Sequence, residues 1–142
     1  MAGAATQPKL QFSHLGLVVK DLPRMEDFYT RILGYQVTDR GTTGQGVTMV
    51  FMTLDPEEHH NLFLVDGKPD AALPPNTIVP HCGPVLHHLS FRVGSLSELR
   101  VMHDRVRSEK GVTDLRPATH GICWAVYFKD PEGNDLEFFA DT

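Results

Sequence analysis

An internal repeat is the feature that most narrows what this chain can fold into. Residues 14–19 read HLGLVV and residues 88–93 read HLSFRV, so a histidine opens two similar apolar segments 74 residues apart. The turn sequence Asp-Pro-Glu at 55–57 returns 75 residues later, at 130–132. Because the spacing hardly changes between these two landmarks, we interpret the chain as one structural unit written twice.

The first copy predicts a strand, a helix and three further strands. A strand over 10–19 leads to Asp21, an N-cap residue, and then to an apolar helix face ended by Gly34. That face consists of Met25, Phe28, Tyr29 and Ile32. Further strands are expected over 35–40, 47–54 and 59–65, with turns at 41–46 and 55–58 between them.

The second copy predicts the same order of elements. A strand begins at Val85, and Ser95 with Glu98 three residues later is a capping-box signal for a helix. Its expected apolar face consists of Leu99, Met102 and Val106. Short strands are expected near 112–115, 122–128 and 135–140. The pattern β-α-β-β-β therefore occurs twice.

The predicted fold class is α+β, a single domain of two tandem βαβββ units. Unit one covers about 10–65, a proline-rich linker covers 66–84, unit two covers about 85–142, and residues 1–9 form a loose tail. Neither unit can bury a sheet face alone. We therefore expect the units to pair into one curved, cup-like mixed sheet with the helices outside.

Composition excludes several classes of function. The 142 residues are 41% hydrophobic and carry a net charge of −5, which argues against an electrostatic grip on nucleic acid or anionic membranes. No apolar run is long enough to span a bilayer, and the first residues lack the layout of a signal peptide. Cys82 and Cys123 have no CxxC spacing, so we expect reduced thiols in a cytoplasmic protein.

Three segments give the chain a recognisable resemblance: EHHNLFL at 58–64, LHHLSF at 86–91, and DPEGNDLEF at 130–138. With the doubled unit, they resemble the vicinal oxygen chelate superfamily, which includes glyoxalase I, fosfomycin and bleomycin resistance proteins and type I extradiol dioxygenases. The similarity covers about residues 10–142. It is greatest to the catalytic domain of the extradiol dioxygenases, and the chain looks like a single-domain member.

The repeat itself points to a metal site. His14 and His88 occupy equivalent positions, and Glu137 interrupts an apolar strand where an unpaired carboxylate would be costly. The resemblance implies that His14, His88 and Glu137 are the metal ligands. Two imidazoles and a carboxylate with open positions suit non-haem Fe(II), with Mn(II) as the alternative. His87 competes with His88, and the register of the repeat favours His88.

A fourth protein ligand distinguishes glyoxalase I and the epimerases of the superfamily. When Asp55 is aligned with Asp130, Leu62 lies opposite Glu137. Leucine cannot bind a metal, so we expect three protein ligands. This disfavours glyoxalase and epimerase chemistry but leaves the fosfomycin resistance proteins open.

The resemblance also implies catalytic roles. His60, expected on the inner face with Leu62, would be the acid/base histidine that deprotonates a catechol. The Tyr127 hydroxyl would hydrogen-bond a substrate oxygen, and His120 would contact the substrate.

The function expected is Fe(II)-dependent extradiol cleavage of a catechol-type ring by O₂. Two alternatives stay open. One is another metal-dependent enzyme of the fold, such as a thiol transferase acting on fosfomycin-like antibiotics, for which Arg92 could supply positive charge. The other is a non-catalytic module that binds a small molecule. We expect a homodimer or higher homo-oligomer, with no nucleic-acid or membrane partner. The sequence does not identify the diol.

Overall fold

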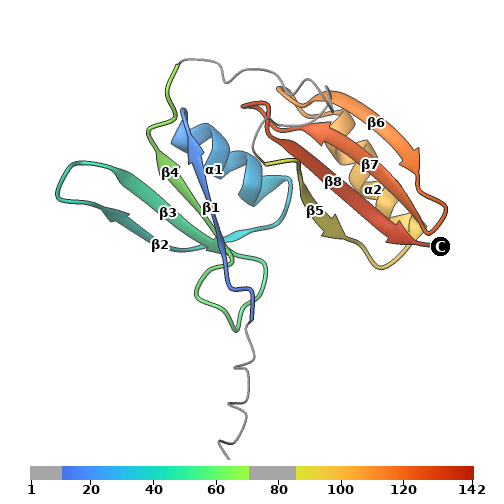
Figure 1. Cartoon of the computed structure of the whole chain (residues 1–142), viewed down its shortest axis with the longest axis horizontal. Helices are drawn as coiled ribbons and strands as arrows, with labels where there is room; N and C mark the ends of the chain where they lie inside the picture. The colour runs from blue at the N-terminus through green and yellow to red at the C-terminus, as the bar shows by residue number, and fades with distance from the viewer. Residues whose placement is uncertain (1–10, 71–85) are drawn as a thin grey trace, which may run out of the picture.

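The computed structural model describes residues 11–70 and 86–142, so the predicted tail at 1–9, most of the linker and Cys82 lie outside the described residues. Unit one contains β1 (Leu15–Val19), α1 (Leu22–Arg31), β2 (Gln36–Thr42), β3 (Thr48–Thr53) and β4 (Leu62–Asp66). Unit two contains β5 (Leu89–Arg92), α2 (Leu96–Arg107), β6 (Thr113–Thr119), β7 (Cys123–Lys129) and β8 (Asp135–Asp141). The predicted α+β class and the doubled βαβββ order are confirmed (Figure 1).

Both helices begin where the sequence signals placed them. The Asp21 side chain accepts a hydrogen bond from the Arg24 amide at 3.1 Å, and Gly34 beyond α1 has a φ of +83°. At α2, Ser95 Oγ accepts from the Glu98 amide at 3.2 Å. The Glu98 carboxylate accepts in return from the amide of Gly94, one residue earlier than in the standard capping box.

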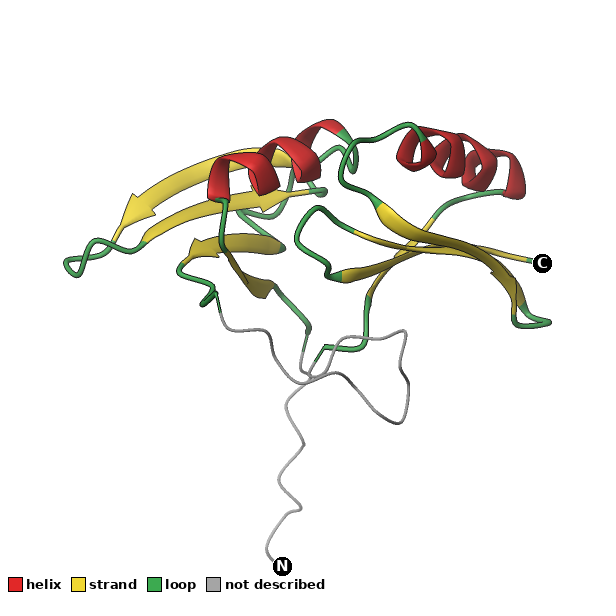
Figure 2. Cartoon of the chain, turned by 90° about the horizontal axis from the view of Figure 1, so that it is seen from above, coloured by secondary structure: helices red, strands yellow, loops and turns green. Residues whose placement is uncertain are grey.

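Each unit forms its own four-stranded mixed sheet. The strand orders are β1-β4-β3-β2 and β5-β8-β7-β6, with β1 parallel to β4, β5 parallel to β8 and the other pairs antiparallel. Both helices lie on one side of the strands (Figure 2). Among the described strands none of one unit pairs with a strand of the other, so the sheets are separate in the single chain. The first strand of each unit, β1 or β5, is therefore an edge strand of its sheet.

The core lies between each sheet and its helix. Alternate residues of the strands turn toward the helices and are buried, while their neighbours face the other way. In unit one the buried strand residues include Val50, Met52, Leu62 and Leu64; in unit two they include Val126, Phe128, Leu136 and Phe138. Each sheet thus keeps a second face that neither α1 nor α2 covers, and Tyr127 and Glu137, the predicted site residues of the strands, lie there.

One set of contacts between the two units lies where α1 meets the turn between β7 and β8. Tyr29, fully buried on α1, donates its hydroxyl to the Asp130 carboxylate at 3.1 Å. One carboxylate oxygen of Glu132 accepts from the backbone amides of Lys20 and Asp21, at 2.8 and 2.7 Å, just before α1. This turn therefore caps a helix that belongs to the other half of the chain.

The Asp130 carboxylate lies at the centre of this contact. It is 1% exposed and also accepts from the amides of Glu132 and Asn134 and from the Asn134 side chain, at 2.8–2.9 Å. Burial raises the pKa of Asp130 above its ordinary value, against the lowering effect of these donors.

We expect Asp130→Ala to lower the free energy of unfolding by about 2–4 kcal/mol, because it leaves several buried donors without an acceptor. Asp55 occupies the corresponding turn of unit one but is exposed, and among the described residues its carboxylate accepts only from the Glu57 amide, at 3.0 Å. Asp55→Ala is therefore the matched control and should cost less than about 1 kcal/mol. Urea unfolding measures both, and equal losses would contradict the role of Asp130.

Candidate functional site

Strand register reveals which positions of the two units correspond on the uncovered faces. In unit two, Glu137 on β8 lies between Ser90 on β5 and Tyr127 on β7. In unit one, Phe63 on β4 lies in the same way between Gly16 on β1 and Phe51 on β3. The same positions therefore carry a polar set in unit two and an aromatic set in unit one.

Glu137 and His88 form the polar centre of unit two. The Glu137 carboxylate is 7% exposed although it lies on the uncovered face, and His88 Nε2 is 3.3 Å from its Oε2 atom. Ser90 Oγ donates to the same oxygen at 2.5 Å. His87 contacts His88 through their Nδ1 atoms at 2.5 Å, so the His88 ring turns its Nε2 toward the carboxylate.

Tyr127 and His120 form a hydrogen-bonded pair beside this centre. His120 Nε2 lies 2.9 Å from the Tyr127 hydroxyl, and the rings of Tyr127 and His88 are 5.6 Å apart. The guanidinium of Arg116, which also pairs with Asp114 at 3.1 Å, lies 5.8 Å from the centre of the Tyr127 ring. Four of the six residues predicted for the site, namely His88, Glu137, Tyr127 and His120, thus lie together.

His14 and His60, the other two predicted residues, lie together in unit one. Their ring centroids are 4.4 Å apart, and Phe63 and Phe51 contact them edge-on at 5.7 and 5.0 Å respectively. Desolvation lowers the pKa of His60, and the nearby imidazoles of His14 and His59 lower it further. A neutral imidazole at physiological pH is able to accept a proton.

The structure does not bring the two groups of residues together within one chain. His14 immediately precedes β1 and His88 immediately precedes β5, and in Figure 1 these strands run in opposite directions, with the start of β1 low and the start of β5 high. Across residues 11–70 and 86–142, no group of three His, Cys, Asp or Glu side chains is placed to hold one metal ion. His88 and Glu137 are close in this arrangement, and His14 is not with them.

Two details of the sequence interpretation need correction. Phe63, not Leu62, is opposite Glu137 in the repeat, and Leu62 faces the core beneath α1 with 2% exposure. His60 lies in the turn before β4, which begins at Leu62 and not at His59. The reason is one extra residue: seven positions separate Asp55 from Leu62, but six separate Asp130 from Leu136. Phenylalanine cannot bind a metal either, so no fourth ligand arises.

Sequence reasoning missed Ser90, Arg116 and Phe63. Ser90 follows His88 by two residues, so strand alternation places both on one face and was a usable signal. Phe63 precedes Glu137 by the same 74 residues that separate the two histidines, and applying that offset would have found it. Arg116 reaches Tyr127 from β6 across a register shift between Thr113 and Arg116, which no sequence pattern marks.

Among the described residues, no helix has the length and apolarity needed to cross a membrane.

The sequence family described as "Glyoxalase/Bleomycin resistance protein/Dioxygenase superfamily" matches residues 11–138. Two curated proteins of Rhodococcus globerulus, biphenyl-2,3-diol 1,2-dioxygenases 2 and 3, are 30% and 32% identical to the chain over 132 residues. These alignments cover 93% of this chain but only 63% and 64% of the relatives, so the chain spans less than two thirds of their length.

Solved structures share the fold at lower identity. A glyoxalase/bleomycin resistance protein/dioxygenase domain from Frankia sp. EAN1pec superposes with a TM-score of 0.75 at 23% identity, covering 95% of this chain and all of that one. A fosfomycin resistance protein from Listeria monocytogenes, solved with Mn(II) and sulfate, has a TM-score of 0.68 at 18% identity, with 93% of each chain covered.

The packing of Phe63 over Gly16 predicts a steric limit in unit one. A Cβ at Gly16 would lie 2.4 Å from the Phe63 ring, so we expect Gly16→Ala to cost about 1–3 kcal/mol of stability. In the Gly16→Ala/Phe63→Ala double variant the clash is removed, so its loss should be smaller than the sum of the single losses. Strictly additive losses in chemical denaturation would show that the two side chains do not interact.

Proposed function

We propose that this chain, which belongs to the glyoxalase/bleomycin resistance protein/dioxygenase superfamily, is an Fe(II)-dependent extradiol dioxygenase that opens the ring of a catechol-type substrate with O₂. The observation that carries the proposal is the buried Glu137 carboxylate facing His88, with the Tyr127–His120 pair next to it. The identity to biphenyl-2,3-diol dioxygenases supports an aromatic diol as substrate.

The donor groups fit a metal. A carboxylate at 7% exposure needs a cation or hydrogen-bond donors nearby, and here an imidazole and a hydroxyl converge on one of its oxygens. Glu137 and His88 would hold Fe(II) together with His14, and Ser90 would orient the carboxylate. When bound, the iron would supply the electronic link between the diol and O₂.

The protein's own contribution is to position the substrate and hold protons. The Tyr127 hydroxyl would hydrogen-bond one oxygen of the diol, and His120, at 2.9 Å, would hold or return the proton of that hydroxyl. His60, kept neutral by its surroundings, would accept a proton from the diol. The aromatic faces of Phe51 and Phe63 would exclude water on the side of unit one.

A second copy of the chain would complete this site. The edges β1 and β5 each carry one row of backbone groups without a strand partner among the described residues, and such edges favour pairing. Pairing the β1 edge of one protomer with the β5 edge of its partner would bring His14 toward the partner's His88 and Glu137. Because the His14 and His60 rings are 4.4 Å apart, His60 would arrive with His14.

The fosfomycin-like alternative is weaker on the described residues. A phosphonate needs positive charge, but Arg92 is paired with Asp141 at 3.1 Å and lies over the Phe139 ring. Arg116 is similarly engaged with Asp114.

Ring opening is the direct test of the proposed function. After anaerobic loading with Fe(II), we expect 2,3-dihydroxybiphenyl, catechol or 3-methylcatechol to give a yellow product and O₂ uptake in air. Glu137→Ala should abolish both, because a metal ligand is lost. Glu57→Ala, an exposed carboxylate in the repeated turn of unit one, should change neither. Iron-loaded protein that consumes no O₂ with any of these diols would contradict the proposal.

The Tyr127–His120 pair makes a second prediction. We expect Tyr127→Phe and His120→Ala each to lower kcat by about 10²-fold while iron binding stays unchanged, since both act on the substrate and its proton. The double variant should lose little more than either single variant, because the two groups act as one unit. Steady-state kinetics with iron analysis measures this, and multiplicative losses would argue for independent roles.

A further inference from the structure

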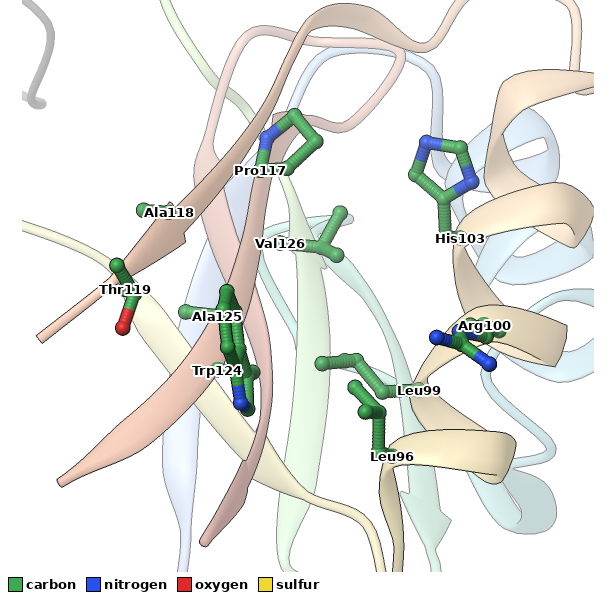
Figure 3. Close-up of a pocket in the computed structure, with 10 residues that line it drawn as sticks. All are labelled: Leu96, Leu99, Arg100, His103, Pro117, Ala118, Thr119, Trp124, Ala125 and Val126. Carbon is green, nitrogen blue, oxygen red and sulfur yellow. The ribbon is translucent and has the colours of Figure 1, made fainter. Parts of the chain in front are cut away.

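A pocket lies on the helix side of the unit-two sheet, between α2 and the strands β6 and β7 (Figure 3). Its volume is about 500 Å³, which is the size of small-molecule sites. Leu99 and Val126 are buried in it, at 3% and 4% exposure. Since Trp124 and Val126 alternate with Tyr127 along β7, the pocket is separated from the Glu137 site by the sheet.

The mouth of the pocket exposes apolar side chains that the core does not use. Trp124 on β7 is 47% exposed and Leu96 at the start of α2 is 38% exposed, and Figure 3 shows them on opposite walls. Pro117 and Ala118 on β6 are small, so β6 does not fill the space that α2 leaves. Two large apolar side chains beside an open volume favour an apolar ligand.

The ionisable side chains that line the pocket are basic. Arg100 and His103, one helical turn apart on α2, line the pocket, and none of the lining residues is acidic, although His103 Nδ1 contacts the carboxylate of the neighbouring Asp104 at 3.0 Å. Within residues 11–70 and 86–142, no carboxylate pairs with the Arg100 guanidinium. Arg100 is exposed and lies beside the apolar lining, so its guanidinium is available to an anionic group that enters the pocket.

Comparison with unit one shows which partner Arg100 lacks. Arg100 is the fifth residue of α2, and its counterpart, the fifth residue of α1, is Glu26. Glu26 forms a two-pronged ion pair with Arg40 on β2. Strand register makes Pro117 the counterpart of Arg40. Asp39 pairs with Phe51 and Arg116 pairs with Tyr127, and Arg40 and Pro117 are the next residues along their strands. The helix-to-strand ion pair of unit one therefore has no counterpart in unit two.

We propose that this pocket binds a small apolar carboxylate, whose hydrocarbon part lies between Leu96, Leu99 and Trp124 and whose carboxylate pairs with Arg100. The ligand supplies from outside the kind of ion pair that Glu26 and Arg40 make within unit one. Arg–carboxylate pairing can use two parallel hydrogen bonds, which fixes the orientation of the ligand. The site is independent of the proposed ring opening, because the sheet lies between the two.

Trp124 gives a direct readout, because it is the single tryptophan of the sequence. Titration of the whole protein with decanoate should change its fluorescence in a saturable way, and 1-decanol of the same chain length should bind about tenfold or more weakly. Arg100→Gln should weaken decanoate about tenfold or more and leave 1-decanol unchanged. Arg107→Gln, on the same helix outside the pocket, is the matched control and should bind decanoate like wild type.

A second variant tests the comparison between the units. Pro117→Glu on the edge strand β6 would give Arg100 an internal partner like that of unit one, and it should weaken decanoate while sparing 1-decanol. Several results would overturn the proposal: no saturable change in Trp124 emission, equal affinity of wild type for the acid and the alcohol, equal decanoate affinity in Arg100→Gln and wild type, or equal weakening by Arg107→Gln.

Discussion

The contact between α1 and the turn at 130–134 determines how the two halves of this chain are arranged. Asp130 accepts the Tyr29 hydroxyl in a buried position, and Glu132 accepts two backbone amides at the start of α1. These bonds tie unit two to α1 and to the residues directly before it. Both helices lie on one side (Figure 2), and β1 and β5 are edge strands of their sheets.

The two units have kept one backbone plan and diverged in chemistry. On the uncovered faces, Ser90, Glu137 and Tyr127 of unit two correspond to Gly16, Phe63 and Phe51 of unit one. On the helix side, unit one joins α1 to β2 with the Glu26–Arg40 ion pair, whereas in unit two a pocket lies between α2 and the strands β6 and β7 beside Arg100. Unit two therefore carries most of the polar side chains of the candidate site, and unit one carries the imidazoles of His14 and His60 and an aromatic surface.

Much of this could be predicted from the sequence because it depends on local patterns. The repeat, the caps at Asp21 and Ser95 and the periodic helix faces fix the elements and their order. His88 and Glu137 were expected together from the resemblance, and the structure places His88 directly before β5, the strand that pairs with β8. The prediction that failed was the residue of unit one that corresponds to Glu137. One extra residue after Asp55 shifts the alignment of the two units by one position, so this residue is Phe63 and not Leu62.

The position of His14 relative to Glu137 could not be predicted, because it depends on how the units pack. Pseudo-symmetry suggested that equivalent histidines meet in one cup. The Asp130 joint instead holds the units through α1. The same Asp-Pro-Glu sequence occurs at 130–132, where Asp130 is buried, and at 55–57, where Asp55 is exposed. The buried joint is a tertiary contact between residues about one hundred positions apart.

Iron content in mixed chains tests most directly whether the site is shared between two protomers. His14→Ala and Glu137→Ala chains are prepared separately, unfolded and refolded together, and tightly bound Fe(II) per chain is then measured. A shared site predicts that each variant alone binds little iron, while the mixture regains about a quarter of the wild-type content, because half of the dimers are mixed and each has one intact site. A mixture that binds no more iron than the separate variants would contradict the account.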